Sequence, residues 1–387
     1  MGGLVEKLCR ENRLDAEGFK MLLLCTDKTL IDQLHHEARK LTDRVFGRKV
    51  FLRGLLEVSN HCRNNCLYCG LRRDNLGLRR YRLTTDNIME CCQRAYSLGF
   101  RTFVMQGGED PAENDDWVVE TIRRIRTLFP DCAITLSLGE KSHESYRRFK
   151  EAGANRYLLR HETRDETHYR LLHPKEMSLT HRLKCLEWLN ELGFQTGCGM
   201  MIGSPGQTVD HLVEDLQYIY ETRPAMVGMG PFIPHHATPF AHEAAGSVET
   251  TLRLISIVRL MLPEVLLPAT TALGSMKNDG RLLGLKAGAN VLMPNVSPPK
   301  AREAYTLYEH KDAGAVDTIE DWERLEKKLN DAGFEIAISR GDNPLFNAQS
   351  QMRYRRIQDE RTKNHAFEAD KIRLIIENQK HKYICTR

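Results

Sequence analysis

The chain has 387 residues, of which 41% are hydrophobic and 28% are charged, which is typical of a globular protein with a substantial core. No apolar run approaches the roughly 20 residues of a membrane-spanning helix, so we expect no contact with a membrane. The net charge of +4 is concentrated in residues 349–387, which hold ten Lys/Arg and five Asp/Glu. The remaining residues are together close to neutral, so we predict no basic face of the kind that nucleic-acid binding would require.

The eleven cysteines and the N-terminal residues indicate the compartment. The N-terminus shows no basic region followed by a long apolar segment, and acidic residues appear at once, so neither a secretory signal nor a transit peptide is predicted. Cysteines in such a chain are expected to stay as thiols. We therefore expect a soluble protein in a reducing compartment, cytoplasmic in a prokaryote, with an organelle as the alternative.

Taken in chain order, the first predicted part is a helical N-terminal extension, residues 1–48, in which leucines recur at helical spacing. From Lys49 on, short β-prone runs alternate with amphipathic stretches. The runs are Val50–Val58, Thr102–Gln106, Ala133–Leu138, Arg156–Leu159, Gln195–Met201, Met226–Gly230, Val265–Ala269 and Asn290–Met293. The helices expected between them are Thr84–Leu98, Asp116–Phe129, Glu144–Ala152, Leu179–Leu192, Thr208–Glu221 and Thr250–Leu262.

Strands that alternate with helices in this way favour parallel pairing, most economically in an α/β fold of the (β/α)8 TIM-barrel type over residues 49–310. A doubly wound open sheet is the alternative. Residues 311–348 are expected to add one helix, Thr318–Asn330, and one strand, Phe334–Ser339. Residues 349–387 form a basic tail to which we assign no function.

Three cysteines, Cys62, Cys66 and Cys69, follow the first strand directly and so lie in a loop at the mouth of the expected barrel. Their thiolates can converge on one inorganic centre but leave it one ligand short, because a four-iron cluster normally takes four cysteines. A structural zinc site would also need a fourth ligand, for which His61 is only a weak local candidate. The spacing therefore favours an iron–sulfur cluster with an open position, as in catalytic metal sites.

Polar groups follow three other expected strands. In Gln106–Pro111 two glycines allow a ligand to approach the backbone, and Glu109 can receive an amino group. Ser137–Glu140 offers a hydroxyl group, and Arg160–Thr163 offers three polar side chains. We expect these groups to gather at the mouth with the cysteines, because the carboxyl ends of parallel strands meet there.

Two later segments are less specific. Gly197–Thr208 is glycine-rich and suits close packing against a flat ring or, equally, against a helix, and it lacks the Gly-Lys-Ser/Thr of a P-loop. His235 and His236 are possible metal ligands, but a solvated pair in a loop is the favoured interpretation.

With these motifs in place, the chain resembles the radical S-adenosylmethionine (SAM) superfamily. The resemblance is carried by the Cys-x3-Cys-x2-Cys loop with Tyr68 before its last cysteine and by Gly107-Gly108-Glu109 after the second strand. Within the superfamily, the segments Cys66–Asn75, Arg80–Thr84 and Gly203–Thr208 are similar to the HydE-type maturases of [FeFe] hydrogenase. The similarity covers about residues 45–310, and the tail lies outside it.

The resemblance implies a set of roles for individual residues. Cys62, Cys66 and Cys69 would ligate a [4Fe–4S] cluster, whose free iron would be chelated by SAM. The implied SAM contacts are Tyr68 (through its backbone), Gly108, Glu109, Ser137, Glu162 and Arg182. The implied substrate contacts are Arg53, Gln106, Thr135, Thr270, Thr271 and Tyr305. Some members of the family carry a second cysteine trio, but Tyr308–Trp322 has no cysteine, so we expect a single cluster.

The resemblance also implies the activity. Cleavage of SAM would give a 5′-deoxyadenosyl radical, which would react with the sulfur of an iron–carbonyl–cyanide–cysteine precursor during assembly of the H-cluster di-iron subcluster. The implied partners are a radical tyrosine lyase, a GTPase scaffold and an electron donor such as a ferredoxin. Arg53 suits an anionic iron complex because guanidinium offers several donors in a fixed fork.

Three alternatives remain at this point. A radical mutase like methylornithine synthase would need an acidic residue poised for a substrate ammonium group. A biotin synthase-like enzyme would need ligands for a second cluster, which the strand ends do not obviously offer. A non-catalytic iron–sulfur scaffold would not cleave SAM.

Overall fold

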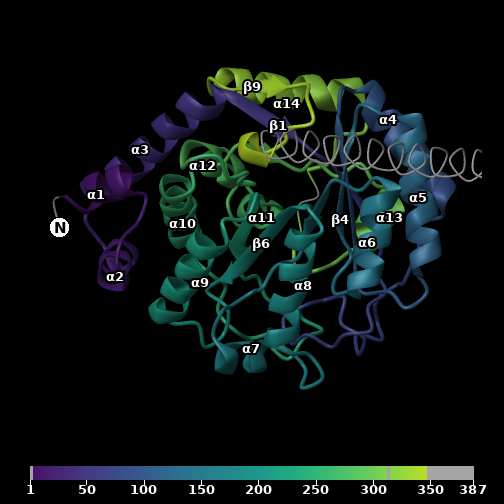
Figure 1. Cartoon of the computed structure of the whole chain (residues 1–387), viewed down its shortest axis with the longest axis horizontal. Coiled ribbons are helices and arrows are strands. Elements are labelled where there is room, and N and C mark those ends of the chain that lie inside the picture. Colours follow the sequence, from purple (N-terminus) through teal and green to yellow (C-terminus); the bar gives the residue numbers. More distant parts are fainter. Residues whose placement is uncertain (1–2, 312–313, 347–387) are drawn as a thin grey trace, which may run out of the picture. The chain divides into compact units, whose positions relative to one another are not determined.

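The computed structural model describes residues 3–311 and 314–346 (Figure 1). The predicted basic tail therefore lies outside the described residues. The chain up to Gly341 belongs to one compact unit, and Asp342 begins a second. No helix within the described ranges is both long and apolar enough to cross a membrane.

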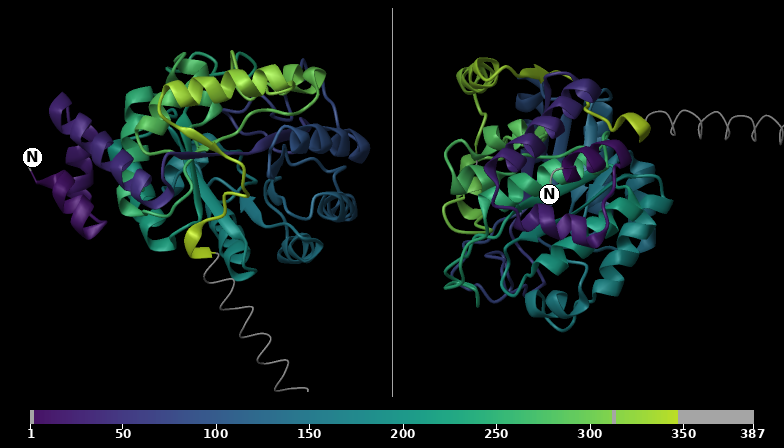
Figure 2. Two further views of the ribbon diagram at one scale, coloured as in Figure 1. Left: turned by 90° about the horizontal axis from the view of Figure 1, so that it is seen from above. Right: turned by 90° about the vertical axis from the view of Figure 1, so that its left-hand side faces the viewer.

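The chain begins with three helices, α1 (Leu4–Glu11), α2 (Ala16–Leu24) and α3 (Lys28–Phe46). The carboxylates of Asp15 and Asp27 accept backbone N–H groups in the first turns of α2 and α3 and so fix where these helices start. Helix α3 packs against α10 (Val248–Met261), so the N-terminal helices lie beside the barrel (Figure 2).

The first predicted run forms two strands, β1 (Lys49–Leu52) and β2 (Gly54–Ser59), separated at the buried Arg53. Strand β2 opens a six-stranded parallel sheet in the order β2-β3-β4-β5-β6-β7. Its other strands are β3 (Thr102–Gly107), β4 (Ala133–Ser137), β5 (Arg156–Leu158), β6 (Gln195–Ile202) and β7 (Met226–Pro231). Strand β1 instead pairs with β8 (Val291–Leu292).

The expected strand Val265–Ala269 is wrong as a continuous strand. Only two single parallel bridges form there, Leu266 with Met226 of β7 and Pro268 with Val291 of β8. Proline has no N–H to donate, so a regular ladder cannot continue through Pro268. A further parallel bridge joins Leu55 of β2 to Asn295, so the two sheets are connected to each other by single bridges. The fold is of the expected α/β barrel type.

The six expected helices are found within one or two residues of their predicted ends. They are α4 (Thr85–Ser97), α5 (Asp115–Leu128), α6 (His143–Ala152), α8 (Leu179–Glu191), α9 (Val209–Thr222) and α10. Four short helices were not expected: α7 (Glu166–Leu172), α11 (Thr271–Met276), α12 (Gly280–Lys286) and α13 (Pro299–Ala304). The helices surround the strands (Figure 1).

The expected C-terminal helix and strand are α14 (Ile319–Asp331) and β9 (Glu335–Ala337). Strand β9 pairs in parallel with β1, so this addition extends the smaller sheet in the order β8-β1-β9.

The two faces of the sheet differ in polarity. In β4, Ile134 and Leu136 belong to the apolar core, whereas Thr135 and Ser137 lie on the opposite face because side chains alternate along a strand. Gln106 is directly in register with Ser137, and Glu57 is in register with Gln106. This polar face is the inner face of the barrel. It extends to the carboxyl ends of the strands, where the expected site lies.

Candidate active site

The cysteine loop after β2 is held at both ends by one side chain, Arg80. Its guanidinium donates to the carbonyl oxygens of Asn60 at 2.5 Å, Leu71 at 2.9 Å, Arg72 at 2.7 Å and Asn75 at 3.3 Å. Cys62, Cys66 and Cys69 lie between these anchor points. The loop conformation is therefore set by protein contacts.

The three cysteines are unpaired, partly buried thiols that lie close enough to influence each other's ionisation. Burial, followed by the negative charge of the neighbouring thiolates, raises the pKa of Cys66 well above its usual value. Burial and the thiolate of Cys62 raise the pKa of Cys69 to about 12. A bound metal cation offsets both penalties, because thiolates coordinate metal with release of their protons. The converging soft donors fit an iron–sulfur cluster.

The glycine turn after β3 packs directly against this loop. A Cβ atom on Gly108 would lie 2.2 Å from the carbonyl oxygen of His61 and 2.8 Å from Cβ of Cys62. Any other residue would displace the cysteine loop, so Gly108 sets how closely the two strand ends approach.

Glu109 is tied to the cysteine loop and to the next strand end. Its Oε2 accepts from Nε of Arg63 at 3.0 Å, and its Oε1 accepts from the backbone N–H of Glu140 at 2.9 Å. Gly139 has a φ of +74°, and a Cβ there would lie 2.1 Å from Cγ of Glu109. Glycine at this turn leaves the space that the Glu109 side chain fills.

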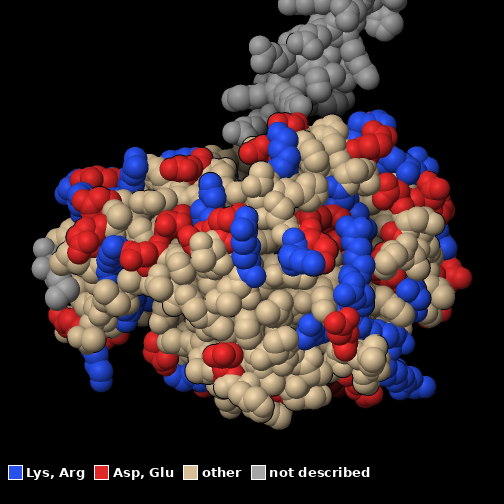
Figure 3. Space-filling model, turned by 90° about the horizontal axis from the view of Figure 1, so that it is seen from below, with Lys and Arg blue, Asp and Glu red and all other residues tan. Residues whose placement is uncertain are grey.

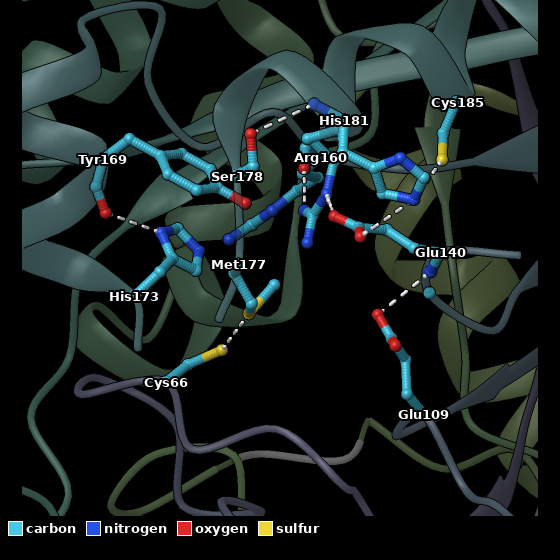
Figure 4. Close-up of polar contacts among 12 residues, drawn as sticks. Cys66, Glu109, Glu140, Arg160, Tyr169, His173, Met177, Ser178, His181 and Cys185 are labelled. Carbon is cyan, nitrogen blue, oxygen red and sulfur yellow. Dashed lines mark hydrogen bonds and ion pairs between the residues drawn. The ribbon is translucent and has the colours of Figure 1, made fainter. Parts of the chain in front are cut away.

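A chain of charged side chains, of which Arg160 is half-buried and the others are buried, links two strand ends to helix α8. Arg182 of α8 donates through Nε to Glu140 Oε1 at 2.5 Å and through Nη1 to the carbonyl oxygen of Arg160 at 2.6 Å. Arg160 in turn makes a bidentate pair with Glu162, at 2.9 and 2.8 Å. In Figure 4, Cys66, Met177, Glu140 and Glu109 border one common space. The structure thus brings the expected residues Glu109, Glu162 and Arg182 together with Cys66.

Glu162 is held in a strained conformation, with a φ of 67°, which non-glycine residues rarely adopt. The residue before it, His161, points the other way, and its Nε2 lies 3.1 Å from Oδ1 of Asp215 on α9. Both side chains are fully buried. The His161–Asp215 pair therefore fixes the backbone on which Arg160 and Glu162 face the site.

Tyr68 packs against a ring system that the sequence did not predict. His173 lies behind it at the end of α7, and burial followed by the charge of Arg182 lowers the His173 pKa to about 3, so this ring is neutral. Its Nδ1 donates to the carbonyl oxygen of Tyr169 at 3.0 Å, so its Nε2 accepts from the Tyr68 hydroxyl at 3.2 Å. The neutral tautomer holds the side chain of Tyr68 in place.

Among the expected substrate residues, Thr135 and Arg53 lie deeper in the barrel than Ser137, whereas Gln106 is level with Ser137. Gln106 donates to the Tyr305 hydroxyl at 3.4 Å, and Arg53 lies against Sδ of Met226 at 3.0 Å. The hydroxyl oxygens of Thr135 and Thr270 are buried without a hydrogen-bond partner among the described residues. Thr271 begins α11 next to Thr270. Thr135 lies one inner layer below Ser137, so a molecule bound to Thr135 would sit beneath one bound to Ser137.

A buried ion pair that the sequence did not suggest lies on the same inner face. Lys311, in the segment after α13, donates to Glu57 of β2 and to the carbonyl oxygen of Tyr305. Both side chains are almost fully buried. The pair could not be foreseen, because the two residues are 254 positions apart and neither belongs to a motif.

His235 and His236 are brought together with Glu309 in the structure. One nitrogen of each ring is already engaged, since His236 Nδ1 contacts Glu309 and His235 Nδ1 accepts the N–H of Ala237 at 3.1 Å. The two rings stack at a centroid distance of 4.4 Å, and the three possible ligand atoms lie within 4.8 Å of one another. We assign no metal to them.

The end of the barrel at which α7 lies is shown in Figure 3. Much of this face carries few charged side chains, and a band of Lys and Arg runs along the right-hand side of it.

Comparisons with known proteins agree with this geometry. Residues 56–219 match the model of the radical SAM superfamily. The chain is 44% identical to the [FeFe] hydrogenase maturase subunit HydE of Thermotoga maritima, over 80% of this chain and 87% of the relative. It is 28% identical to 3-methylornithine synthase of Methanosarcina acetivorans, over 86% of this chain and 93% of the relative.

Solved structures show the same fold. The crystal structure of methylornithine synthase (PylB) superposes with a TM-score of 0.77 and 27% identity, over 86% of this chain and 97% of that one. The structure of the maturase HydG superposes with a TM-score of 0.72 at 19% identity, over 87% of this chain and 75% of that one, which supports the fold alone.

A parallel α/β barrel with three converging thiols at its mouth defines a class of enzymes that hold an iron–sulfur cluster beside SAM. The chain belongs to the radical SAM superfamily and, within it, to the HydE family. It is therefore a radical SAM enzyme that uses a [4Fe–4S] cluster and SAM.

Proposed function

We propose that this radical SAM enzyme acts in assembly of the di-iron subcluster of the [FeFe]-hydrogenase active site. The observation that carries the proposal is the 44% identity to a HydE maturase across most of both chains. The polar inner face adds support, because Arg53, Gln106 and Thr135 offer hydrogen-bond donors to an anionic ligand below the strand ends.

We assign one cluster, ligated by Cys62, Cys66 and Cys69, with SAM as the remaining ligand. When bound, the cluster and SAM supply a 5′-deoxyadenosyl radical. The protein's own part is to hold SAM through the backbone of Tyr68, through Gly108, Glu109 and Ser137, and through Glu162 and Arg182. The buried ion pair Glu140–Arg182 and the half-buried pair Arg160–Glu162 keep these groups oriented.

The proposed substrate is an iron–carbonyl–cyanide–cysteine precursor made by a radical tyrosine lyase. It would bind beneath SAM against Arg53, Gln106, Thr135, Thr270, Thr271 and Tyr305. In this position its cysteinyl sulfur would be accessible to the radical. The product would pass to a GTPase scaffold, and a ferredoxin-type protein would supply the electron.

The competing function is that of an amino-acid mutase, supported by the 27% identity and common fold with methylornithine synthase. A mutase needs a carboxylate for the substrate ammonium group. On the inner face the candidate is Glu57, but Lys311 already neutralises it. This occupied carboxylate favours the anionic iron complex over an amino acid.

The first experiment tests the radical chemistry. Anaerobically reconstituted protein should bind about four irons and release 5′-deoxyadenosine from SAM after reduction with dithionite. Cys66→Ala should lose both the cluster and the cleavage, whereas Cys9→Ala, which changes a thiol of the N-terminal helix α1, should keep both. Cleavage by Cys66→Ala at the wild-type rate would overturn the cluster assignment.

The second experiment separates the two substrates. The protein should restore activation of apo-[FeFe] hydrogenase in an extract that lacks its own HydE, and it should form no methylornithine from lysine. Methylornithine formation without hydrogenase activation would establish the mutase instead.

A further inference from the structure

The outer side of the cysteine loop carries a strongly basic surface that the proposed chemistry does not use. Between positions 60 and 82 the chain has six arginines and one acidic residue, Asp74. We call the exposed and half-exposed part of this segment the cysteine-loop rim and define it as Arg72, Arg73, Leu76 and Arg79.

The arginines of this segment fall into two groups. Arg80 is turned inward onto backbone carbonyls, whereas Arg63 and Arg82 pair with the buried carboxylates of Glu109 and Asp110. By contrast, the Arg73 side chain is 64% exposed beside the exposed Asp74. Arg79 is exposed and makes no side-chain ion pair with any residue in the described ranges. The rim therefore presents net positive charge to the solvent.

Leu76 stands at the tip of the rim and is 92% exposed, the most exposed large apolar side chain of the described residues. Its position is rigid: its N–H donates to Asp74 O at 3.0 Å, and the buried Asn75 donates through Nδ2 to Gly70 O at 2.8 Å. Gly70 directly follows Cys69. Leu76 therefore offers a partner one exposed apolar contact, and in the sequence it lies midway between the exposed Arg73 and Arg79.

We propose that the cysteine-loop rim docks an acidic one-electron carrier protein, an inference that rests on the proposed radical SAM function. The carrier loses one electron and the iron–sulfur group on the cysteine loop gains it, with no transfer of atoms. Positive charge on the rim attracts and orients an acidic surface, and Leu76 supplies the apolar contact at its centre. Docking here places the carrier on the same short loop that holds the cluster ligands.

The experiment compares a protein donor with a small one. The variant Arg73→Glu/Arg79→Glu changes exposed side chains only, and Arg123→Glu/Lys286→Glu makes the same charge change on exposed positions of α5 and α12. An acidic two-cluster ferredoxin is the probe. Its binding to immobilised reconstituted protein is measured, as is 5′-deoxyadenosine formation with reduced ferredoxin and with dithionite.

The rim variant should bind the ferredoxin at least about tenfold more weakly than wild type and lose ferredoxin-driven cleavage in proportion. Its dithionite-driven cleavage should stay unchanged, as should every property of the control variant. Binding to wild type should weaken as NaCl rises from about 50 to about 300 mM, and binding to the rim variant should respond less.

Leu76→Glu supplies an independent variant, and it should also weaken ferredoxin binding with dithionite-driven cleavage intact. Equal ferredoxin binding by wild type, rim variant and control would overturn the docking site. A rim variant that loses as much SAM cleavage with dithionite as with ferredoxin would also overturn it. Failure of wild type to cleave SAM with dithionite would instead overturn the proposed function, so the two failures are distinguishable.

Discussion

At the scale of single residues, the site depends on buried charges that neutralise one another. Arg182 is buried on α8 and pairs with Glu140, whose backbone N–H also positions Glu109. Removing one partner of such a pair leaves the other charge buried without compensation, which is more costly than losing the attraction itself. Glu140 is thus a positioning residue for the SAM-binding groups.

We predict that Glu140→Gln weakens SAM binding about tenfold, which corresponds to about 1.4 kcal/mol. The reason is that the Arg182 guanidinium would turn from its present position toward another acceptor. Isothermal titration of reconstituted protein with SAM measures the effect, and iron content should not change. Glu144→Gln, a change of an exposed side chain nearby, should bind SAM as wild type does. Equal affinities in the two variants would contradict the positioning role.

The sequence alone could predict the cysteine ligands of the site but not the contacts of Arg182 and His173 that support it. Cys62, Cys66 and Cys69 stand in one short segment, so their spacing was enough to predict convergence. Arg182 lies 42 positions from Glu140 and has the pattern of a helix-surface charge, so only the resemblance pointed to it. His173 ends a helix too short to show a hydrophobic period, and its part in holding Tyr68 depends on tertiary packing.

At the scale of elements, helix ends were predictable where a side chain caps them. Thr84, Thr208 and Thr318 each form a capping box, and the helices after them begin where expected. Helices α11 and α13, with six residues each, lack a side-chain cap and were missed. The β-prone run Val50–Val58 predicts one strand, but its two halves are β1 and β2, which pair in different sheets.

Helix α14 and strand β9 lie across one end of the barrel (Figure 1). The ring of Trp322 on α14 packs edge-on against Phe100 at a centroid distance of 5.3 Å and covers Gly99. We predict that Trp322→Ala lowers the free energy of unfolding by about 3–5 kcal/mol, since a buried aromatic side chain leaves a cavity. Urea denaturation measures the loss.

Ile319→Ala, on the same helix at a half-exposed position, is the matched control and should change the stability by less than about 0.5 kcal/mol. A Trp322→Ala variant with the free energy of unfolding of the wild type would show that α14 contributes little to the stability of the barrel.

At the scale of the whole barrel, residues 305–311 connect parts of the chain that are distant in sequence. The N–H of Gly70 in the cysteine loop donates to Leu307 O at 2.8 Å, and the N–H of Glu309 donates to Pro234 O, after β7, at 3.1 Å. Lys311 then reaches inward to Glu57. This one segment thus joins the cluster loop, a late strand end and the inner face, so the mouth is assembled only when the whole chain has folded.

Removing one partner of the Glu57–Lys311 pair should make the stability of this assembly depend on pH. Burial raises the pKa of Glu57, and Lys311 opposes the rise. A carboxyl group whose pKa is raised by folding stabilises the protein while protonated, and this stabilisation is lost as pH rises through the folded pKa. Without Lys311 the Glu57 pKa rises further, so the penalty at neutral pH grows.

We predict that Lys311→Met lowers the free energy of unfolding by about 3–5 kcal/mol at neutral pH and by clearly less near pH 5, where Glu57 can accept a proton. Glu57→Gln/Lys311→Met should recover most of the stability and remove the added pH dependence, because no buried charge is left. Urea midpoints at both pH values, compared with the exposed substitution Lys327→Met, measure these effects. A pH-independent loss in Lys311→Met would show that packing of the lysine stem, and not its charge, holds the segment to the inner face.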